Sequence, residues 1–242
     1  MMQKVIITAL LFLSASASAT TMPTGFYGKM GFGQSYRQNQ DTTLNDTQSG
    51  MPLAIKDHLD FKHSNSYEIA VGYRYPQLSW LTTELALSYH SKASLDGDHV
   101  LINGSPADEK THLHLKSTAL MLSGQVDLAT LFNQDNWLFH PYFGLGIGVS
   151  RNELSDLSTT LNNTSSEFKI HNTHTDFAWQ GKLGVTYAAT QHIILDLSYA
   201  YNDYGKATSR TAKNPTAASE TLNGGSIDYR TQEVMLGMRY FF

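Results

Sequence analysis

Two pairs of adjacent residues have the side chains of a nucleophile and its base. His63 precedes Ser64, and His90 precedes Ser91. A serine activated by a neighbouring histidine is a common catalytic nucleophile. Adjacent residues of a regular strand point to opposite faces, however, so neither pair forms a hydrogen-bonded dyad if its segment is a strand. No other nucleophile–base spacing stands out, and we therefore do not expect an enzyme.

Histidines also offer metal ligands. His112 and His114 would place two imidazoles on one face of a strand, which is half of a zinc or copper site, and His171 and His174 could contribute from a neighbouring loop. No cysteine or acidic spacing completes a metal motif. We therefore interpret these residues as solvated loop histidines and expect no metal or cofactor, although they could make the loop surface sensitive to pH near their ordinary pKa of about 6.5. Eight of the ten histidines lie in or beside polar stretches: His58, His63, His90, His99, His112, His114, His171 and His174.

Charged residues recur on the polar side of segments that alternate between large apolar and small or polar residues. An isolated charge inside a protein is costly, so we expect these charges to form ion pairs. An eight-stranded barrel is just wide enough for its own side chains, which favours a structural network that fills the interior. A narrow gated pore and paired catalytic carboxylates are the alternatives. The nine residues are Lys29, Glu68, Arg74, Glu84, Asp127, Lys182, Asp196, Glu233 and Arg239.

Eight segments with a period of two would position these charges. The clearest is PYFGLGIGVS at residues 141–150, in which four apolar residues alternate with three glycines. A period of two indicates strands with two unlike faces. The segments are residues 24–36, 66–75, 81–89, 114–128, 141–150, 177–187, 192–201 and 233–242.

The connections between these segments alternate in length. Long polar links are expected at residues 38–65, 91–113, 152–176 and 203–228, and short links at 76–79, 129–138 and 188–191. Strict alternation of this kind is typical of an antiparallel up-and-down barrel with both termini at one end. The prediction is an all-β, eight-stranded barrel with four long loops and three short turns.

The distribution of side chains indicates that this barrel spans a membrane. Large apolar residues share one face and small or charged residues the other, which suits lipid outside and a tight polar interior. A soluble barrel that encloses a ligand would have its apolar face inside. Tyrosines gather at strand ends, as in the aromatic girdles of membrane barrels. They are Tyr36, Tyr75, Tyr89, Tyr187, Tyr201 and Tyr240.

The composition and the first residues agree with export to such a membrane. The 242 residues include no cysteine and have a net charge of −4, so no basic surface suggests nucleic acid. Residues 1–19 combine a lysine, a short apolar run and SASASA, which are the three parts of a cleaved signal peptide. The barrel domain is then expected at residues 20–242. The later apolar runs are too short for a spanning helix, and the remaining way to cross lipid is a closed barrel.

Three stretches carry a family resemblance: FYGKMGFG at residues 26–33, PYFGLGIGV at 141–149 and LGMRYFF at 236–242. With the strand pattern they resemble the small outer-membrane β-barrels of Gram-negative bacteria, which include the OmpA-type transmembrane domain and OmpX- and Opa-like proteins. The resemblance implies an outer-membrane location and a monomer surrounded by lipid. Met238, Tyr240 and Phe242 are similar to the family's terminal signal for the barrel-insertion machinery.

The same resemblance points to a structural or surface-interaction role. It implies an adhesin-like or antigen-like protein whose long loops contact a host cell or matrix ligand. A small solute or ion pore is the first alternative. A lipid-modifying enzyme is the second, although the lipid A deacylase pattern keeps one residue between histidine and serine, and neither His63-Ser64 nor His90-Ser91 has it.

Overall fold

The computed structural model describes the barrel and parts of its connections. The described backbone comprises residues 22–37, 41–42, 57–58, 60–61, 64–97, 100–102, 105–107, 109–161, 164–208, 212–213, 221–222 and 226–242. Side chains are described for residues 22–36, 64–91, 115–153, 172–206 and 228–242. The expected signal peptide, residues 1–19, lies outside the described part of the chain.

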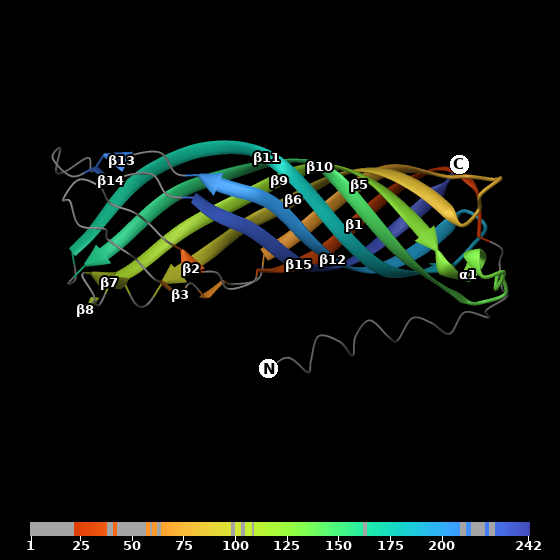
Figure 1. Ribbon diagram of the computed structural model, residues 1–242, viewed down its shortest axis with the longest axis horizontal. Coiled ribbons are helices and arrows are strands. Elements are labelled where there is room, and N and C mark those ends of the chain that lie inside the picture. The colour runs from red at the N-terminus through yellow and green to blue at the C-terminus, as the bar shows by residue number, and fades with distance from the viewer. Residues whose placement is uncertain are drawn as a thin grey trace.

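Eight long strands form a closed antiparallel barrel (Figure 1). Each long strand pairs with the next one along the chain, and β15 returns to pair with β1, where Lys29 lies opposite Arg239. Closure leaves no open edge in the cylinder, and the predicted up-and-down fold is confirmed. The strands are β1 (Gly25–Arg37), β5 (Ser64–Arg74), β6 (Leu81–Gly97), β9 (Glu109–Asp127), β10 (Phe139–Leu161), β11 (Thr164–Ala188), β12 (Ile193–Thr208) and β15 (Ser226–Phe241).

The two ends of the cylinder differ. Short strands within the long connections gather at one end, which we call the loop end, and the short helix α1 (Leu128–Leu131) lies with the C-terminus at the other, the turn end (Figure 1). No helix in the described part of the chain is long and apolar enough to cross a membrane. The short strands are β2 (Asp41–Thr42), β3 (Asp57–His58), β4 (Asp60–Phe61), β7 (Val100–Ile102), β8 (Ser105–Ala107), β13 (Ala212–Lys213) and β14 (Thr221–Leu222).

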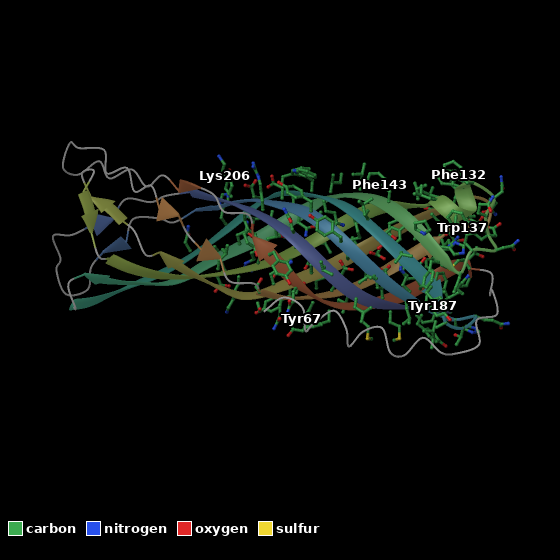
Figure 2. The ribbon with its side chains drawn as sticks, turned by 90° about the horizontal axis from the view of Figure 1, so that it is seen from below. Tyr67, Phe132, Trp137, Phe143, Tyr187 and Lys206 are labelled. Carbon is green, nitrogen blue, oxygen red and sulfur yellow. The ribbon has the colours of Figure 1, made fainter. Side chains whose placement is uncertain are left out.

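Burial is reversed relative to a water-soluble barrel. Along β5, Ile69 and Val71 are mostly exposed whereas Glu68 is buried, and strict alternation runs through the whole strand. Outward side chains are mainly aliphatic at mid-barrel, and aromatic rings flank them, as with Tyr67 towards the loop end and Tyr187 at the turn end (Figure 2). This is the lipid-facing band with aromatic girdles that the alternation predicts.

The strands extend further towards the loop end than predicted. The expected loop at residues 152–176 is mostly strand, because β10 continues to Leu161 and β11 begins at Thr164. The expected loop at residues 91–113 is likewise shortened by β6, which ends at Gly97, and by β9, which begins at Glu109. Strand pairing uses backbone groups, so polar segments rich in serine and threonine can continue a ladder beyond the apolar band. The short link at residues 129–138 also contains most of α1, a helix that the strand alternation does not predict.

Candidate functional site: the charged lumen

The nine charged residues expected inside the barrel are all buried. Each is at most 6% exposed: Lys29, Glu68, Arg74, Glu84, Asp127, Lys182, Asp196, Glu233 and Arg239. They come from seven of the eight long strands and divide into three groups along the barrel axis. Because the bore of an eight-stranded barrel is narrow, side chains from non-adjacent strands reach one another.

The central group joins two lysines to two glutamates. Lys29 Nζ lies 2.7 Å from Glu68 Oε1 and 3.6 Å from Glu84 Oε1. Lys182, which comes from β11, lies 3.4 Å from Glu68 Oε2 and 3.9 Å from Glu84 Oε1. β11 is not adjacent to β5 or β6 in the sheet, so these contacts cross the bore. Two cations face two carboxylates, which balances the charge of the group.

Arg239 forms the second part of this central layer. Its guanidinium is ion-paired with Asp196 on the adjacent strand β12 and donates across the bore to Gln125 Oε1 at 3.0 Å. The rings of Tyr27 and Tyr142 flank it at 5.4 Å and 5.3 Å from Cζ to the ring centroids. Such cation–π contacts strengthen when the groups are shielded from water. The guanidinium is therefore held by an acid, an amide and two aromatic faces.

The two tyrosines also connect the layer through hydrogen bonds. The Tyr27 hydroxyl donates to Glu84 Oε2 at 2.8 Å, and the Tyr142 hydroxyl donates to Asp196 Oδ1 at 3.1 Å. Each ring packs over a glycine of the neighbouring strand. A Cβ at Gly72 would lie 2.2 Å from Tyr27 Cζ, and one at Gly184 would lie 2.5 Å from Tyr142 Cζ. Glycine is therefore required at both positions for the two rings to occupy these places.

A second group lies at the turn end of the lumen. Arg74 Nη2 donates to Asp127 Oδ2 at 2.8 Å and to Thr130 Oγ1 at 3.0 Å. His140 Nδ1 lies 3.0 Å from the same Asp127 oxygen. Asp127 also caps α1, since its side chain accepts from the backbone N–H of Thr130. The group therefore ties the helix to the barrel wall, and Ala129 of this helix is buried, with 1% of its surface exposed.

A third group lies towards the loop end, around His90 and Glu233. His90 Nε2 is 3.2 Å from Glu233 Oε1 and 3.3 Å from the Tyr204 hydroxyl. Asn202 donates to the other Glu233 oxygen at 3.1 Å. The Tyr204 ring stacks on Tyr229 with centroids 5.4 Å apart. Interpreting His90 as a solvated loop histidine was wrong, because it is fully buried.

Several lumen residues were not identified from the sequence: Tyr27, His90, His140, Tyr142, Tyr204 and Tyr229. All are at most 5% exposed. They occupy the same alternate positions as residues predicted to point inward. His90 follows Glu84 and Ser88 at even spacing on β6, and Tyr142 precedes Gly144 by two positions on β10. The alternation could therefore have predicted that these side chains point inward, but large rings were not expected in a narrow lumen.

The residues considered for catalysis and metal binding do not come together among the described side chains. His90 points into the lumen, whereas the Ser91 hydroxyl accepts from the backbone N–H of Asn65 in an exposed contact. Among the described residues, no three His, Cys, Asp or Glu side chains form a metal-binding group. The side chains of His58, His63, His99, His112, His114 and His171 lie outside the described part, whereas His174 is half-buried on β11.

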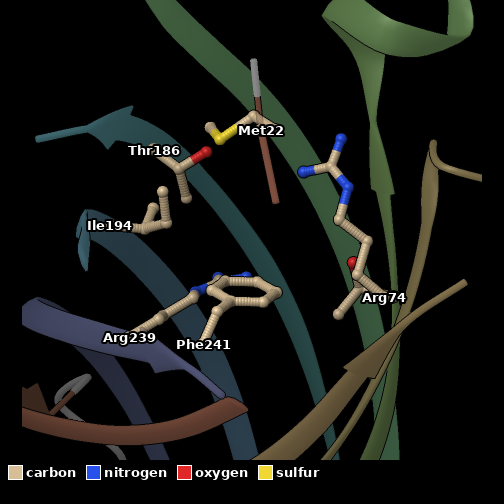
Figure 3. A pocket seen from close by; sticks show the side chains of 7 residues that line it. Met22, Arg74, Thr186, Ile194, Arg239 and Phe241 are labelled. Carbon is tan, nitrogen blue, oxygen red and sulfur yellow. The ribbon is translucent and has the colours of Figure 1, made fainter. Parts of the chain in front are cut away.

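A small cavity lies at the turn end of the lumen (Figure 3). Its volume is about 10 Å³, which is close to the space that one water molecule needs. Its lining includes two guanidiniums and several apolar side chains, and it is too small for an organic solute. The lining residues are Met22, Arg74, Thr82, Thr186, Ile194, Arg239 and Phe241.

Comparison with solved structures supports the architecture. The outer membrane protein OprG of Pseudomonas aeruginosa superposes with a TM-score of 0.57 at 14% identity, covering 93% of this chain and all of that one. Neisserial surface protein A has a TM-score of 0.50 at 18% identity, covering 90% of this chain and 98% of that one.

Sequence relatives agree with this fold. The outer membrane protein PagN of Salmonella typhimurium is 27% identical over 182 residues, which are 72% of this chain and 71% of that protein. A Rickettsia conorii protein named "Putative adhesin RC1281" is 25% identical over 194 residues, which are 77% of this chain and 71% of that one. The model of the outer membrane protein beta-barrel domain matches residues 5–242. The chain therefore belongs to the outer membrane protein β-barrel family and resides in the outer membrane of a Gram-negative bacterium.

Proposed function

We propose that this protein is a surface-contact protein whose barrel is closed to solutes and whose long loops carry the binding function. Outer-membrane location follows from the family, and a relative whose name ascribes adhesion supports the contact role. Three long connections, residues 38–63, 98–108 and 209–225, and the extended β10–β11 hairpin lie at one end of the barrel and would form the recognition surface, because scaffolds commonly carry function on such loops. The expected partner is a ligand on a host cell or in its matrix.

The observation that carries the proposal is the set of contacts that cross the bore. Lys182 on β11 reaches Glu68 on β5, Arg239 on β15 reaches Gln125 on β9, and His90 on β6 reaches Glu233 on β15. In each case the two strands are not neighbours in the sheet. A solute would have to break these contacts to pass, and separating a buried ion pair is costly. These contacts favour a structural role for the nine lumen charges over a pore.

Cell binding tests the contact role. Bacteria that lack adhesins would express the chain or one of four variants. In three of them a long connection is replaced by a short glycine–serine turn, for example between Thr208 and Ser226, and in the fourth the distal part of the β10–β11 hairpin, residues 155–171, is replaced in the same way. We expect the parent chain to increase the number of bacteria bound to cultured cells, and at least one replacement to abolish that increase. Barrel assembly would be verified by heat-modifiable migration in electrophoresis. Retained binding by all four assembled variants, or no binding by the parent, would refute the role.

Conductance and lipid analysis test the two alternatives. The purified full chain in a planar bilayer should show no steady openings, whereas a pore would show them. Lipid A from cells with and without the protein should have the same mass, whereas a lipid-modifying enzyme would change it. The opposite orientations of His90 and Ser91 support the absence of a catalytic dyad there.

The last strand is proposed to be the segment that the insertion machinery recognises. Met238, Tyr240 and Phe242 all face outward, and Phe242 is 84% exposed. Its backbone N–H donates to the carbonyl oxygen of Phe26 at 3.1 Å, which continues the pairing of β15 with β1. Deleting Phe242 should reduce the assembled fraction in cells. An unchanged assembled fraction would contradict this assignment.

A further inference from the structure

The connection between β9 and β10 combines a rigid fold with exposed large apolar side chains. Residues 128–138 contain α1 and a turn, and they present Leu131, Phe132, Trp137 and Leu138 to the surroundings. Phe132 is 67% exposed and Trp137 is 52% exposed. We call these four residues the turn-end patch. Large apolar side chains gathered on one exposed segment indicate contact with a partner or a membrane.

The segment has a fixed conformation. The backbone N–H of Gln134 donates to the carbonyl oxygen of Ala129 at 2.8 Å, and that of Trp137 donates to Gln134 at 3.1 Å. Asn133 adopts a left-handed conformation with φ of 58°, which asparagine tolerates better than most residues. The buried group of Arg74, Asp127 and Thr130 attaches the helix to the barrel. The patch is therefore held in place relative to the barrel wall.

The patch is continuous with the lipid-facing surface. Along β10, Phe143 and Phe139 face outward, and Trp137 and Leu138 directly before the strand are exposed as well. Phe139 in turn contacts Tyr187 of β11, with ring centroids 5.7 Å apart. Figure 2 shows Phe132 and Trp137 together at the turn end, beyond Phe143. The same apolar surface thus runs from mid-barrel to the turn.

The tip between the apolar residues is polar. Asn133, Gln134, Asp135 and Asn136 are all exposed. An apolar body with a polar tip suits the boundary between acyl chains and headgroups, where tryptophan is enriched. The backbone N–H of Asp127 donates to the carbonyl oxygen of Trp80 at 2.8 Å, so the neighbouring turn, with exposed Leu78, lies beside α1. The third turn, residues 189–192, carries no large apolar residue.

From this arrangement we infer that the turn-end patch is a membrane anchor that inserts into the headgroup–acyl boundary of the leaflet at the turn end. The occupant of the surface is the phospholipid of that leaflet. Because the patch occupies one side of the rim, it fixes the depth of the barrel on the side of β6, β9 and β10. Continuity with the lipid-facing band favours lipid over a protein that would dock at the end of the barrel.

Site-directed spin labelling tests the anchor, and the absence of native cysteine allows a unique label at each position. The variants Phe132→Cys, Asp135→Cys and Leu145→Cys would each carry a nitroxide in the full chain, reconstituted in phosphatidylcholine vesicles. Collisions with oxygen report lipid, and collisions with a water-soluble nickel chelate report water. The Leu145 label is the mid-band reference, and the Asp135 label is the polar-tip reference.

We expect the Phe132 label to favour oxygen over the chelate by several fold relative to the Asp135 label, and to lie at a depth between the two references. If the chelate reaches the Phe132 label as readily as the Asp135 label, the patch lies in water and the inference is wrong. A second measurement needs no labelling. In the variant Trp80→Phe/Trp179→Phe, emission from Trp137 should be quenched more by lipids brominated near the headgroup end of the chain than by lipids brominated near its middle. Quenching by aqueous iodide alone would overturn the anchor independently.

Discussion

Replacing Lys29 by methionine removes one of two cations from the central group while keeping a side chain of similar length. Lys29 lies 2.7 Å from Glu68 and 3.6 Å from Glu84, and its own side chain is fully buried. Removing one partner of a buried ion pair typically costs about 3–5 kcal/mol, because the remaining charge is uncompensated. Lys182 stays within 3.4 Å of Glu68 and offsets part of this cost. We therefore expect the unfolding free energy to fall by about 3 kcal/mol, the lower limit of that range.

The double variant Lys29→Met/Glu68→Gln shows whether this loss comes from charge. It leaves Lys182 beside Glu84, with one cation facing one anion, so its cost should be less than the sum of the two single variants by about 1–3 kcal/mol. Urea titrations of barrels refolded into lipid vesicles, followed by heat-modifiable migration, would measure each value. Lys206→Met, at an exposed lysine, is the control and should change stability by at most about 0.5 kcal/mol. Additive effects of the two lumen substitutions would refute the charge network.

Four further substitutions test the lipid face, the packing of the lumen and the loop end. Leu145→Arg should lower the unfolding free energy by about 2–4 kcal/mol in a lipid refolding titration, because it places a charge at mid-membrane. Gly146→Arg points inward and should lower it by about 1–3 kcal/mol through overpacking, and this loss should not depend on lipid thickness. Gly72→Ala should cost about 1–3 kcal/mol, since its methyl group would displace the tyrosine ring packed there; a neutral result in the same titration would contradict this packing. Asp176, beyond the apolar band, accepts from the backbone N–H groups of Lys206 and Phe177, which lowers its pKa. The ionised Asp176 carboxylate therefore stabilises the fold above its ordinary pKa of about 3.9, and this stabilisation is lost as the pH falls through the lowered value. The difference in unfolding free energy between the parent chain and Asp176→Asn should shrink on acidification. A difference that stays constant with pH would contradict this assignment.

Alternation along the strands was enough to predict the barrel and the burial of its charged residues. The period of two assigned Lys29, Glu68 and Arg239 to one face and the apolar residues to the other, and a narrow cylinder leaves few other arrangements. Partners could not be predicted, because which cation meets which carboxylate depends on barrel stagger. The contact between Lys182 and Glu68 joins residues 114 positions apart, and no local pattern encodes it.

Polar composition led to a wrong prediction at two places in the chain. Residues 152–176 contain many serines, threonines and asparagines and were interpreted as a loop, yet β10 and β11 pair through most of that stretch. His90 was grouped with loop histidines because a polar stretch follows it, although its parity on β6 directs it inward towards Glu233. In both cases the strand continues despite its polar side chains, because the neighbouring strand supplies partners for its backbone hydrogen bonds.

Conductance of a barrel with shortened loops tests the central claim most directly. Replacing the three long connections and residues 155–171 of the β10–β11 hairpin by short turns removes any obstruction by the loops and leaves the lumen contacts intact. The account predicts that this variant, once assembled in a planar bilayer, shows no steady ion current, because Lys182, Arg239 and His90 still reach across the bore. Steady openings in the shortened barrel would contradict it and would assign closure to the loops instead.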